Sequence, residues 1–182
     1  MVARRMRFLE TFRATNEGMN DPSILDPNVR AALETLNIDY EILECEPHLA
    51  DTAEFCAHYG IAAEDACNAI LVALKTNPRT YIACLVRADT RLDVNHRVSE
   101  LVGVKRLSFA SAEETAQLTG QLIGGVTIFG LPAELPIYVD AHVMERERII
   151  VGGGNRSSKL RLDPRELLKL AKVQVADVAI QR

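Results

Sequence analysis

The stretch "NAILVALKTNPRTYIACLVRAD", residues 68–89, decides the fold of this chain. Two apolar runs rich in strand-forming residues flank the polar segment "KTNPRT", and its Asn-Pro pair is typical of a turn. The pattern predicts a β-hairpin. Because both runs are too apolar for edge strands that face water, we expect them at the centre of a sheet.

Helices and strands alternate irregularly around this hairpin. Residues 25–38 predict a helix that Asp26 caps and Pro27 opens, and Ser111 with Glu114 forms a capping box that predicts another. Further helices are expected at residues 48–60, capped by Asp51 or Thr52, at residues 91–104, capped near Asp93, and at residues 163–171. Further strands are expected at residues 39–47, 105–110, 124–130 and 135–141, with a second hairpin over residues 146–163. Residues 172–179 are expected to form a short terminal strand or a tail. This order favours an α+β fold, or an α/β fold with a mixed sheet, over a doubly wound parallel sheet.

The chain shows no internal repeat, linker or low-complexity segment. We therefore expect an N-terminal arm over residues 1–25 and a single domain over residues 26–182. Four arginines of the arm could touch a polyanion, although a solvated tail is the favoured interpretation. They are Arg4, Arg5, Arg7 and Arg13.

Composition excludes several classes of protein. The 182 residues are 48% hydrophobic and 25% charged, as in an ordinary soluble globular protein. No apolar run approaches the roughly 18–20 residues of a membrane span, so we expect a cytoplasmic protein with no membrane contact. The net charge of −4 argues against broad coating of a nucleic acid but leaves room for contact with one end of an RNA. Four cysteines without CxxC spacing predict free, mostly buried thiols, and we expect neither a metal nor a cofactor.

Two glycine clusters are the strongest candidates for a binding site. In "IIVGGGNRSSKLRL", residues 149–162, neither the P-loop pattern nor the dinucleotide-binding pattern is completed. The chemistry favours two interpretations about evenly, a glycine-rich hairpin turn or backbone amides kept open beside a ligand. In "TGQLIGGVTIFG", residues 119–130, close approach of a ligand likewise competes with a β-bulge. The four histidines are scattered and no G-x-S-x-G motif occurs, so a nucleophilic triad finds little support.

Five segments in order resemble the YbaK/ProX family of aminoacyl-tRNA editing domains, which is associated with prolyl-tRNA synthetase. They are "ECEPHLADTAEFCAHYG", "DACNAILVAL", "GGVTIFG", "LPIYVDA" and "IIVGGGNRSSKLRLDPREL". The resemblance runs from about residue 38 to residue 170. It implies a curved mixed sheet surrounded by helices and hydrolysis of the ester between a wrong amino acid and its tRNA.

The resemblance also implies which residues form the site. The expected catalytic group is Asn68, Gly124, Gly125 and Thr127. The expected substrate-binding group is His48, Ile128, Asp140, Gly152, Gly153, Gly154, Asn155, Arg156, Ser157 and Lys159. The implied pocket lies between the hairpin strand, the loop that begins at Gly124 and the late glycine turn.

Two positions depart from the family. Its catalytic-site lysine falls on Asn68, and the proline of its loop falls on Ile128. Asn carries no charge and cannot act as a base. Losing one preorganised group near an oxyanion costs roughly 3–4 kcal/mol, so the substitution puts activity in doubt.

Two principal hypotheses follow. In the first, the chain is a trans-editing deacylase: Asn68 and Thr127 orient the aminoacyl group, glycine amides stabilise the oxyanion, and Arg156 with Lys159 contacts the terminal nucleotide. In the second, the pocket binds an aminoacyl-tRNA 3′ end or a related small ligand without cleaving it. A scaffold that retains only the fold is the least favoured alternative. The expected partners are the tRNA acceptor end and an aminoacyl-tRNA synthetase.

Overall fold

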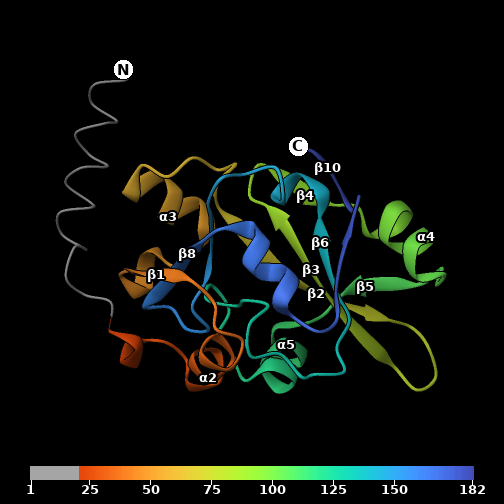
Figure 1. Ribbon diagram of the computed structural model, residues 1–182. Coiled ribbons are helices and arrows are strands. Elements are labelled where there is room, and N and C mark those ends of the chain that lie inside the picture. Colours follow the sequence, from red (N-terminus) through yellow and green to blue (C-terminus); the bar gives the residue numbers. More distant parts are fainter. Residues whose placement is uncertain (1–20) are drawn as a thin grey trace.

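The long hairpin lies at the centre of the molecule, as the sequence predicts. The computed structural model describes residues 21–182, so the four arginines of the arm lie outside the described residues (Figure 1). Strands β2 (Cys67–Leu74) and β3 (Thr80–Arg87) pair antiparallel along their whole length, with Asn68 opposite Val86. They are two of the three inner strands of a five-stranded sheet with the order β5-β2-β3-β6-β9.

The sheet is mixed, which confirms the expected α+β architecture. Strand β5 (Leu107–Phe109) pairs antiparallel with β2, whereas β6 (Ile137–Asp140) and β9 (Val173–Ala176) extend the other side in parallel. A second sheet has the order β1-β8-β7, built from β1 (Tyr40–Glu44), β7 (Ile149–Gly152) and β8 (Ser158–Leu162). A third consists of β4 (Thr90–Leu92) and β10 (Ala179–Gln181).

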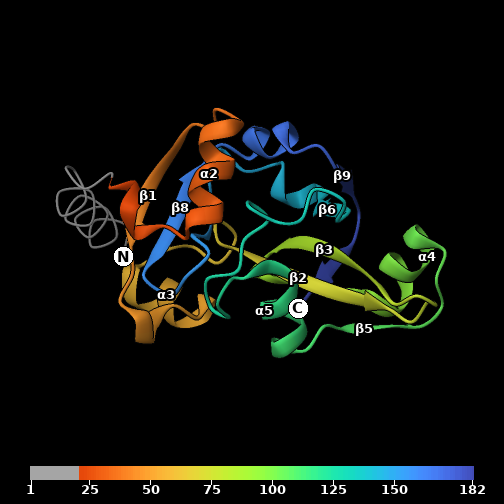
Figure 2. The ribbon, with the colours of Figure 1, turned by 90° about the horizontal axis from the view of Figure 1, so that it is seen from below.

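The two faces of the five-stranded sheet pack against different partners. Because side chains alternate along a strand, Leu71 and Leu85 point to one face, and Val72 and Val86 point to the other. The first face contributes to the main core with helix α2 (Pro27–Thr35) and the three-stranded sheet. The second face packs against β4, the turn η3 (Val94–Val98) and the segment before β10. Figure 2 shows α2 with β1 and β8 at one end of the molecule, and α4 with β5 at the other.

The helices begin and end largely where the sequence predicts. Asp26 caps α2 by accepting from the amide of Asn28 at 2.9 Å, and both bonds of the Ser111–Glu114 capping box form. The other helices are α3 (Thr52–Tyr59), α4 (Ser99–Val102) and α5 (Ala112–Thr119). Short turns complete the elements: η1 (Pro22–Ile24), η2 (Pro47–Leu49), η4 (Ala141–Val143) and η5 (Pro164–Lys169). In residues 21–182, no helix combines the length and the apolar character that a bilayer crossing requires.

Three expected elements differ in the structure. Residues 124–130 form turns instead of a strand, because the amide of Thr127 donates to the Gln121 side chain and not to a neighbouring strand. The segment expected as one helix over residues 91–104 begins as β4, which pairs with β10. Residues 163–171 form a 3₁₀ turn where a helix was expected.

The described end of the expected arm packs against the domain. Leu25 is buried, and the carbonyl of Ile24 accepts a 2.7 Å hydrogen bond from Asn155 Nδ2. The remaining residues of the expected arm lie outside the described part of the chain. All four cysteines are free thiols, as predicted; Cys56 is the half-buried one and the others are buried.

Candidate functional site

Asn68 is the second residue of strand β2 and points to the second face of the sheet, on the same side as Val86. Its Oδ1 atom accepts a 2.6 Å hydrogen bond from Thr52 Oγ1, the first residue of α3. This bond engages the amide oxygen. The NH₂ group of Asn68 is therefore the end that can donate to a ligand.

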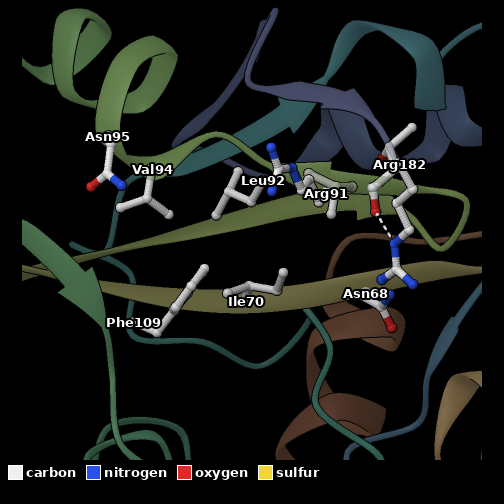
Figure 3. Close-up of a pocket in the computed structure, with 10 residues that line it drawn as sticks. Asn68, Ile70, Arg91, Leu92, Val94, Asn95, Phe109 and Arg182 are labelled. Atoms are coloured by element: carbon white, nitrogen blue, oxygen red, sulfur yellow. Dashed lines mark hydrogen bonds between the residues drawn. The ribbon is translucent and has the colours of Figure 1, made fainter.

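Asn68 lines a hollow of about 390 Å³ (Figure 3). This volume lies in the range of small-molecule sites. Half of its lining residues are apolar and half are polar or charged, and the walls come from both strands of the hairpin, from β4 and from β5. The lining residues are Asn68, Ile70, Val86, Thr90, Arg91, Leu92, Val94, Asn95, Phe109 and Arg182.

The charge of the hollow is positive. Two arginines, Arg91 and Arg182, contribute to its lining, and the lining contains no carboxylate. Arg182 Nε donates a 3.0 Å hydrogen bond to the carbonyl of Thr90, which fixes the side chain beside β4. An anion that enters the hollow thus meets cationic donors without an acidic competitor.

The N-terminus of α3 lies beside Asn68 because Thr52 is its first residue. Asp51 occupies the N-cap position, but its side chain caps no helix amide. Its carboxylate instead pairs with Arg156 Nη2 at 3.2 Å, so Asp51 stands at the predicted cap position without making the side-chain cap bond. The positive end of the helix dipole is consequently placed next to Asn68 without a capping carboxylate.

The two glycine clusters contact each other, backbone against backbone. A Cβ atom on Gly125 would lie 1.8 Å from the carbonyl oxygen of Asn155, and one on Gly152 would lie 2.1 Å from the carbonyl oxygen of Gly125. The amide of Gly154 donates to Gly125 O at 2.8 Å. The glycines therefore permit close approach of two chain segments, and the hollow beside Asn68 contains none of them in its lining.

This packing corrects the expected oxyanion role of the glycine amides. The amides of Gly125, Gly153 and Gly154 donate to the carbonyls of Leu122, Ser158 and Gly125. These donors are occupied by the protein, so the expectation that they face a ligand is wrong for these three residues. The sequence predicts a pocket between Asn68 and the late glycine turn. The hollow that Asn68 lines is a different one, because no residue of the glycine turn contributes to its lining.

Arg156 and Lys159 are engaged by the protein rather than turned toward a nucleotide. Arg156 Nε donates to the carbonyl of Pro47 at 2.8 Å, and its Nη1 donates to the carbonyl of Ile123 at 2.9 Å. Lys159 Nζ donates to the carbonyls of Ala50 and Gly124, both at 2.7 Å. These bonds tie the late turn, the residues before α3 and the Gly124 loop together.

Lys159 is a buried cation. Only 5% of the residue is exposed, and Nζ lies 5.5 Å from the centre of the Phe55 ring. Desolvation lowers the pKa of Lys159 below the ordinary value, although coulombic interaction with Cys45 and Asp51 opposes this. Lys159 therefore cannot make the expected contact with a terminal phosphate in this arrangement, because its ammonium group is buried and bonded to two backbone carbonyls.

The other expected binding residues lie elsewhere. Asn155 holds the turn together, since its Oδ1 accepts from the amide of Ser157 and from Ser158 Oγ. Thr127 and Ile128 are fully buried, and the Thr127 hydroxyl finds no hydrogen-bond partner among residues 21–182. The side chain of His48 is 71% exposed beside Glu46.

Asp140 is a structural carboxylate. It is fully buried, and its Oδ2 accepts from the amides of Val178 and Ala179 at 3.0 and 2.9 Å. Its Oδ1 accepts from the amide of His142 and lies 2.9 Å from the His142 Nδ1 atom. Asp140, His142 and Asp177 offer ligand atoms within 4.8 Å of one another, but these bonds already engage both oxygens of Asp140.

Several residues of the hollow were not predicted from the sequence. Thr52, which binds Asn68 but does not line the hollow, was expected only as a helix cap. No motif marks Thr90, Arg91 or Arg182. Their proximity follows from the pairing of β4 with β10, which joins residues about 90 positions apart. Part of the lining could have been predicted from the alternation of side chains along β2, because it places Ile70 on the same face as Asn68.

Comparisons with known proteins agree with this fold. The sequence profile of the aminoacyl-tRNA editing domain matches residues 46–170. EbsC of Enterococcus faecalis, a proposed Cys-tRNA(Pro)/Cys-tRNA(Cys) deacylase, is 25% identical over 109 residues, which cover 60% of this chain and 64% of EbsC. The match thus spans less than two thirds of that relative. YwhH of Bacillus subtilis, which has no assigned function, is 24% identical over 140 residues, 77% of this chain and 87% of YwhH.

Two solved structures share the architecture. The protein APE2540 superposes with a TM-score of 0.75 and 28% identity, covering 84% of this chain and 99% of that one. A proposed trans-editing enzyme for prolyl-tRNA synthetase superposes with a TM-score of 0.74 and 29% identity, covering 86% of this chain and 99% of that one. Because the profile matches well over half of the chain, this protein belongs to the aminoacyl-tRNA editing domain family.

Proposed function

We propose that this protein is a trans-editing deacylase that hydrolyses the ester between a wrong amino acid and the 3′ end of its tRNA. The observation that carries the proposal is the hollow at Asn68, which combines apolar walls with two cations in a chain of the editing family. The Asn68 NH₂ group donates to the carbonyl oxygen of the ester. Thr52 holds the amide in that orientation.

The reaction needs only water as co-reactant. The oxygen of water bonds to the ester carbon, and the bond between that carbon and the ribose oxygen breaks. One proton of water passes to the ribose oxygen and the other remains with the released carboxyl group, which then ionises. Negative charge develops on the carbonyl oxygen during attack, where the Asn68 amide and the N-terminus of α3 stabilise it.

The lining of the hollow suggests what it accepts. Ile70, Leu92 and Phe109 form apolar walls that suit a small, uncharged amino-acid side chain. Arg91 is exposed on β4 at the rim, where it suits the phosphate of a terminal nucleotide. The net charge of −4 leaves little general electrostatic attraction for tRNA. One structural neighbour is a proposed trans-editing enzyme for prolyl-tRNA synthetase. We therefore infer that this synthetase supplies part of the tRNA selection.

Hydrolysis of a panel of mischarged tRNAs, Cys-tRNA(Pro) among them, tests the proposal. We expect release of the amino acid by the wild type on at least one substrate and a rate about 10- to 100-fold lower for Asn68→Ala. Asn28→Ala, an exposed substitution on α2, is the matched control and keeps the wild-type rate. Failure of the wild type on every substrate would reject the deacylase.

Binding without cleavage is the second candidate, and the uncharged Asn68 favours it. Asn68→Lys separates the two functions. If the wild type binds aminoacyl-tRNA and only the lysine variant cleaves it, the protein is a binding module. If the wild type cleaves and Asn68→Ala does not, Asn68 carries the chemistry.

A further inference from the structure

We propose that Arg182 supplies the positive charge that position 68 lacks, so that Asn68 and Arg182 together stabilise the oxyanion of the ester. The inference rests on the proposed function and adds a catalytic residue to it. Both side chains line the same hollow. Figure 3 shows the guanidinium of Arg182 turned toward the Asn68 side chain, across the opening between β2 and the Arg182 segment.

The pairing of β10 with β4 places Arg182 there. Gln181 lies opposite Thr90 in the antiparallel register, so Arg182 comes directly after the last paired residue. Its Nε atom donates to the carbonyl of Thr90 at 3.0 Å. The guanidinium is thereby held through Nε, and its two Nη groups carry the remaining N–H donors.

Buried groups fix the segment that carries Arg182. Asp140 accepts from the amides of Val178 and Ala179, and Arg97 Nη1 donates to the carbonyl of Ala179 at 2.8 Å. The amide of Asp93 donates to Val178 O at 2.9 Å. These bonds give Asp140 a positioning role toward the hollow, although it does not line it.

The charge of Arg182 is available to a ligand. Arg182 Nε binds the carbonyl of Thr90, and among residues 21–182 no Asp or Glu side chain contributes to the lining of the hollow. Charge-assisted hydrogen bonds are roughly twice as strong as neutral ones. A cation beside the neutral Asn68 amide therefore gives the oxyanion a charged donor from a different strand, since β2 offers none at that position.

Steady-state deacylation by the full chain tests the proposal. We expect Arg182→Ala to lower kcat about 10- to 100-fold and to change KM less than about threefold. Arg182→Lys keeps part of the rate because it keeps the charge. Asn68→Lys in the Arg182→Ala background restores kcat, because the two cations substitute for each other. A loss confined to KM would show a phosphate contact instead, and an unchanged kcat would overturn the inference.

Two controls separate this effect from general damage. Gln181→Ala perturbs the neighbouring exposed residue of β10, and Arg165→Ala removes an exposed arginine that pairs with Asp163. Both variants should keep the wild-type kcat and the wild-type Tm. A fall in kcat for Gln181→Ala equal to that for Arg182→Ala would assign the effect to the strand and overturn the role of the guanidinium.

Binding of two substrate analogues tests the role of Arg182 separately from the deacylase activity. The probes are two aminoacyl-adenosine analogues, one with a neutral amide and one with an anionic phosphonate in place of the ester. We expect the wild type to prefer the phosphonate and Arg182→Ala to lose at least about tenfold of that preference. This result stands even if no tRNA is cleaved. Equal preference in wild type and variant would contradict the inference while leaving the deacylase intact.

Discussion

Thr52 and Asn68 are joined side chain to side chain, with Thr52 Oγ1 donating a 2.6 Å hydrogen bond to Asn68 Oδ1. The bond links the first residue of α3 to the start of strand β2 in the central hairpin. Because the bond occupies the amide oxygen, the Asn68 NH₂ group is the part of the side chain that can donate to a ligand in the hollow, and its orientation is fixed.

Thr52→Val should therefore impair catalysis more than stability. The variant keeps the β-branched shape of the side chain but removes the donor, so the Asn68 amide loses its fixed orientation. We expect kcat to fall about tenfold and the free energy of unfolding to fall by about 1 kcal/mol. Thr35→Val on the exposed face of α2 is the control. A kcat equal to that of the wild type would show that the Thr52 bond does not orient the reacting group.

Gly125→Ala should destabilise the fold severely. The added Cβ would lie 1.8 Å from the carbonyl oxygen of Asn155, and backbone cannot move aside as a flexible side chain can. We expect a loss of more than about 3 kcal/mol, or failure to fold, in urea denaturation. Gly103→Ala is the matched control, because open space surrounds it and its cost of about 1 kcal/mol comes from its positive φ alone. Equal stability of the two variants would contradict the packing of the glycine clusters.

Lys159 should make stability depend on alkaline pH. Burial lowers its pKa from 10.5, so between the lowered pKa and pH 10.5 the unfolded chain binds more protons than the folded one. The contribution of Lys159 to stability is complete above pH 10.5 and is lost as the pH falls through the lowered pKa. We expect the free energy of unfolding of the wild type to rise with pH in this window relative to Lys159→Met. The exposed Lys105→Met should show the wild-type slope; parallel slopes for Lys159→Met and the wild type would count against this assignment.

The four thiols should react in a defined order. Desolvation raises the pKa of Cys84 to about 12 and raises that of Cys67 as well, and both are buried in the sheet. Cys56 is half-buried, so iodoacetamide should label it first in the native protein, with Cys67 and Cys84 protected until unfolding. Mass spectrometry of the labelled peptides measures the order. Early labelling of Cys67 would place it outside the sheet interior.

The fold was largely predictable because its signals are local. The two apolar runs around "KTNPRT" and the caps at Asp26 and Ser111 each predict an element from a few neighbouring residues, and all of them form. The strand expected at residues 124–130 does not form, because the Gln121 side chain binds the amide of Thr127. A contact between a side chain and a backbone amide six residues apart leaves no periodic trace in the sequence.

The site was less predictable than the fold. The role of Asn68 follows from its position in the family pattern, and it does line a hollow. The glycines, by contrast, have two physical uses that a sequence cannot separate, and here they admit a neighbouring backbone. Arg182 joins the hollow only through the pairing of β10 with β4, which no local pattern encodes.

A crystal structure of the protein with a non-hydrolysable aminoacyl-adenosine amide tests the central claim most directly. The account predicts that the carbonyl of the analogue accepts from Asn68 Nδ2, with its side chain between Ile70, Leu92 and Phe109. An analogue seated against the Gly124–Gly125 loop and the late glycine turn, away from Asn68, would contradict it.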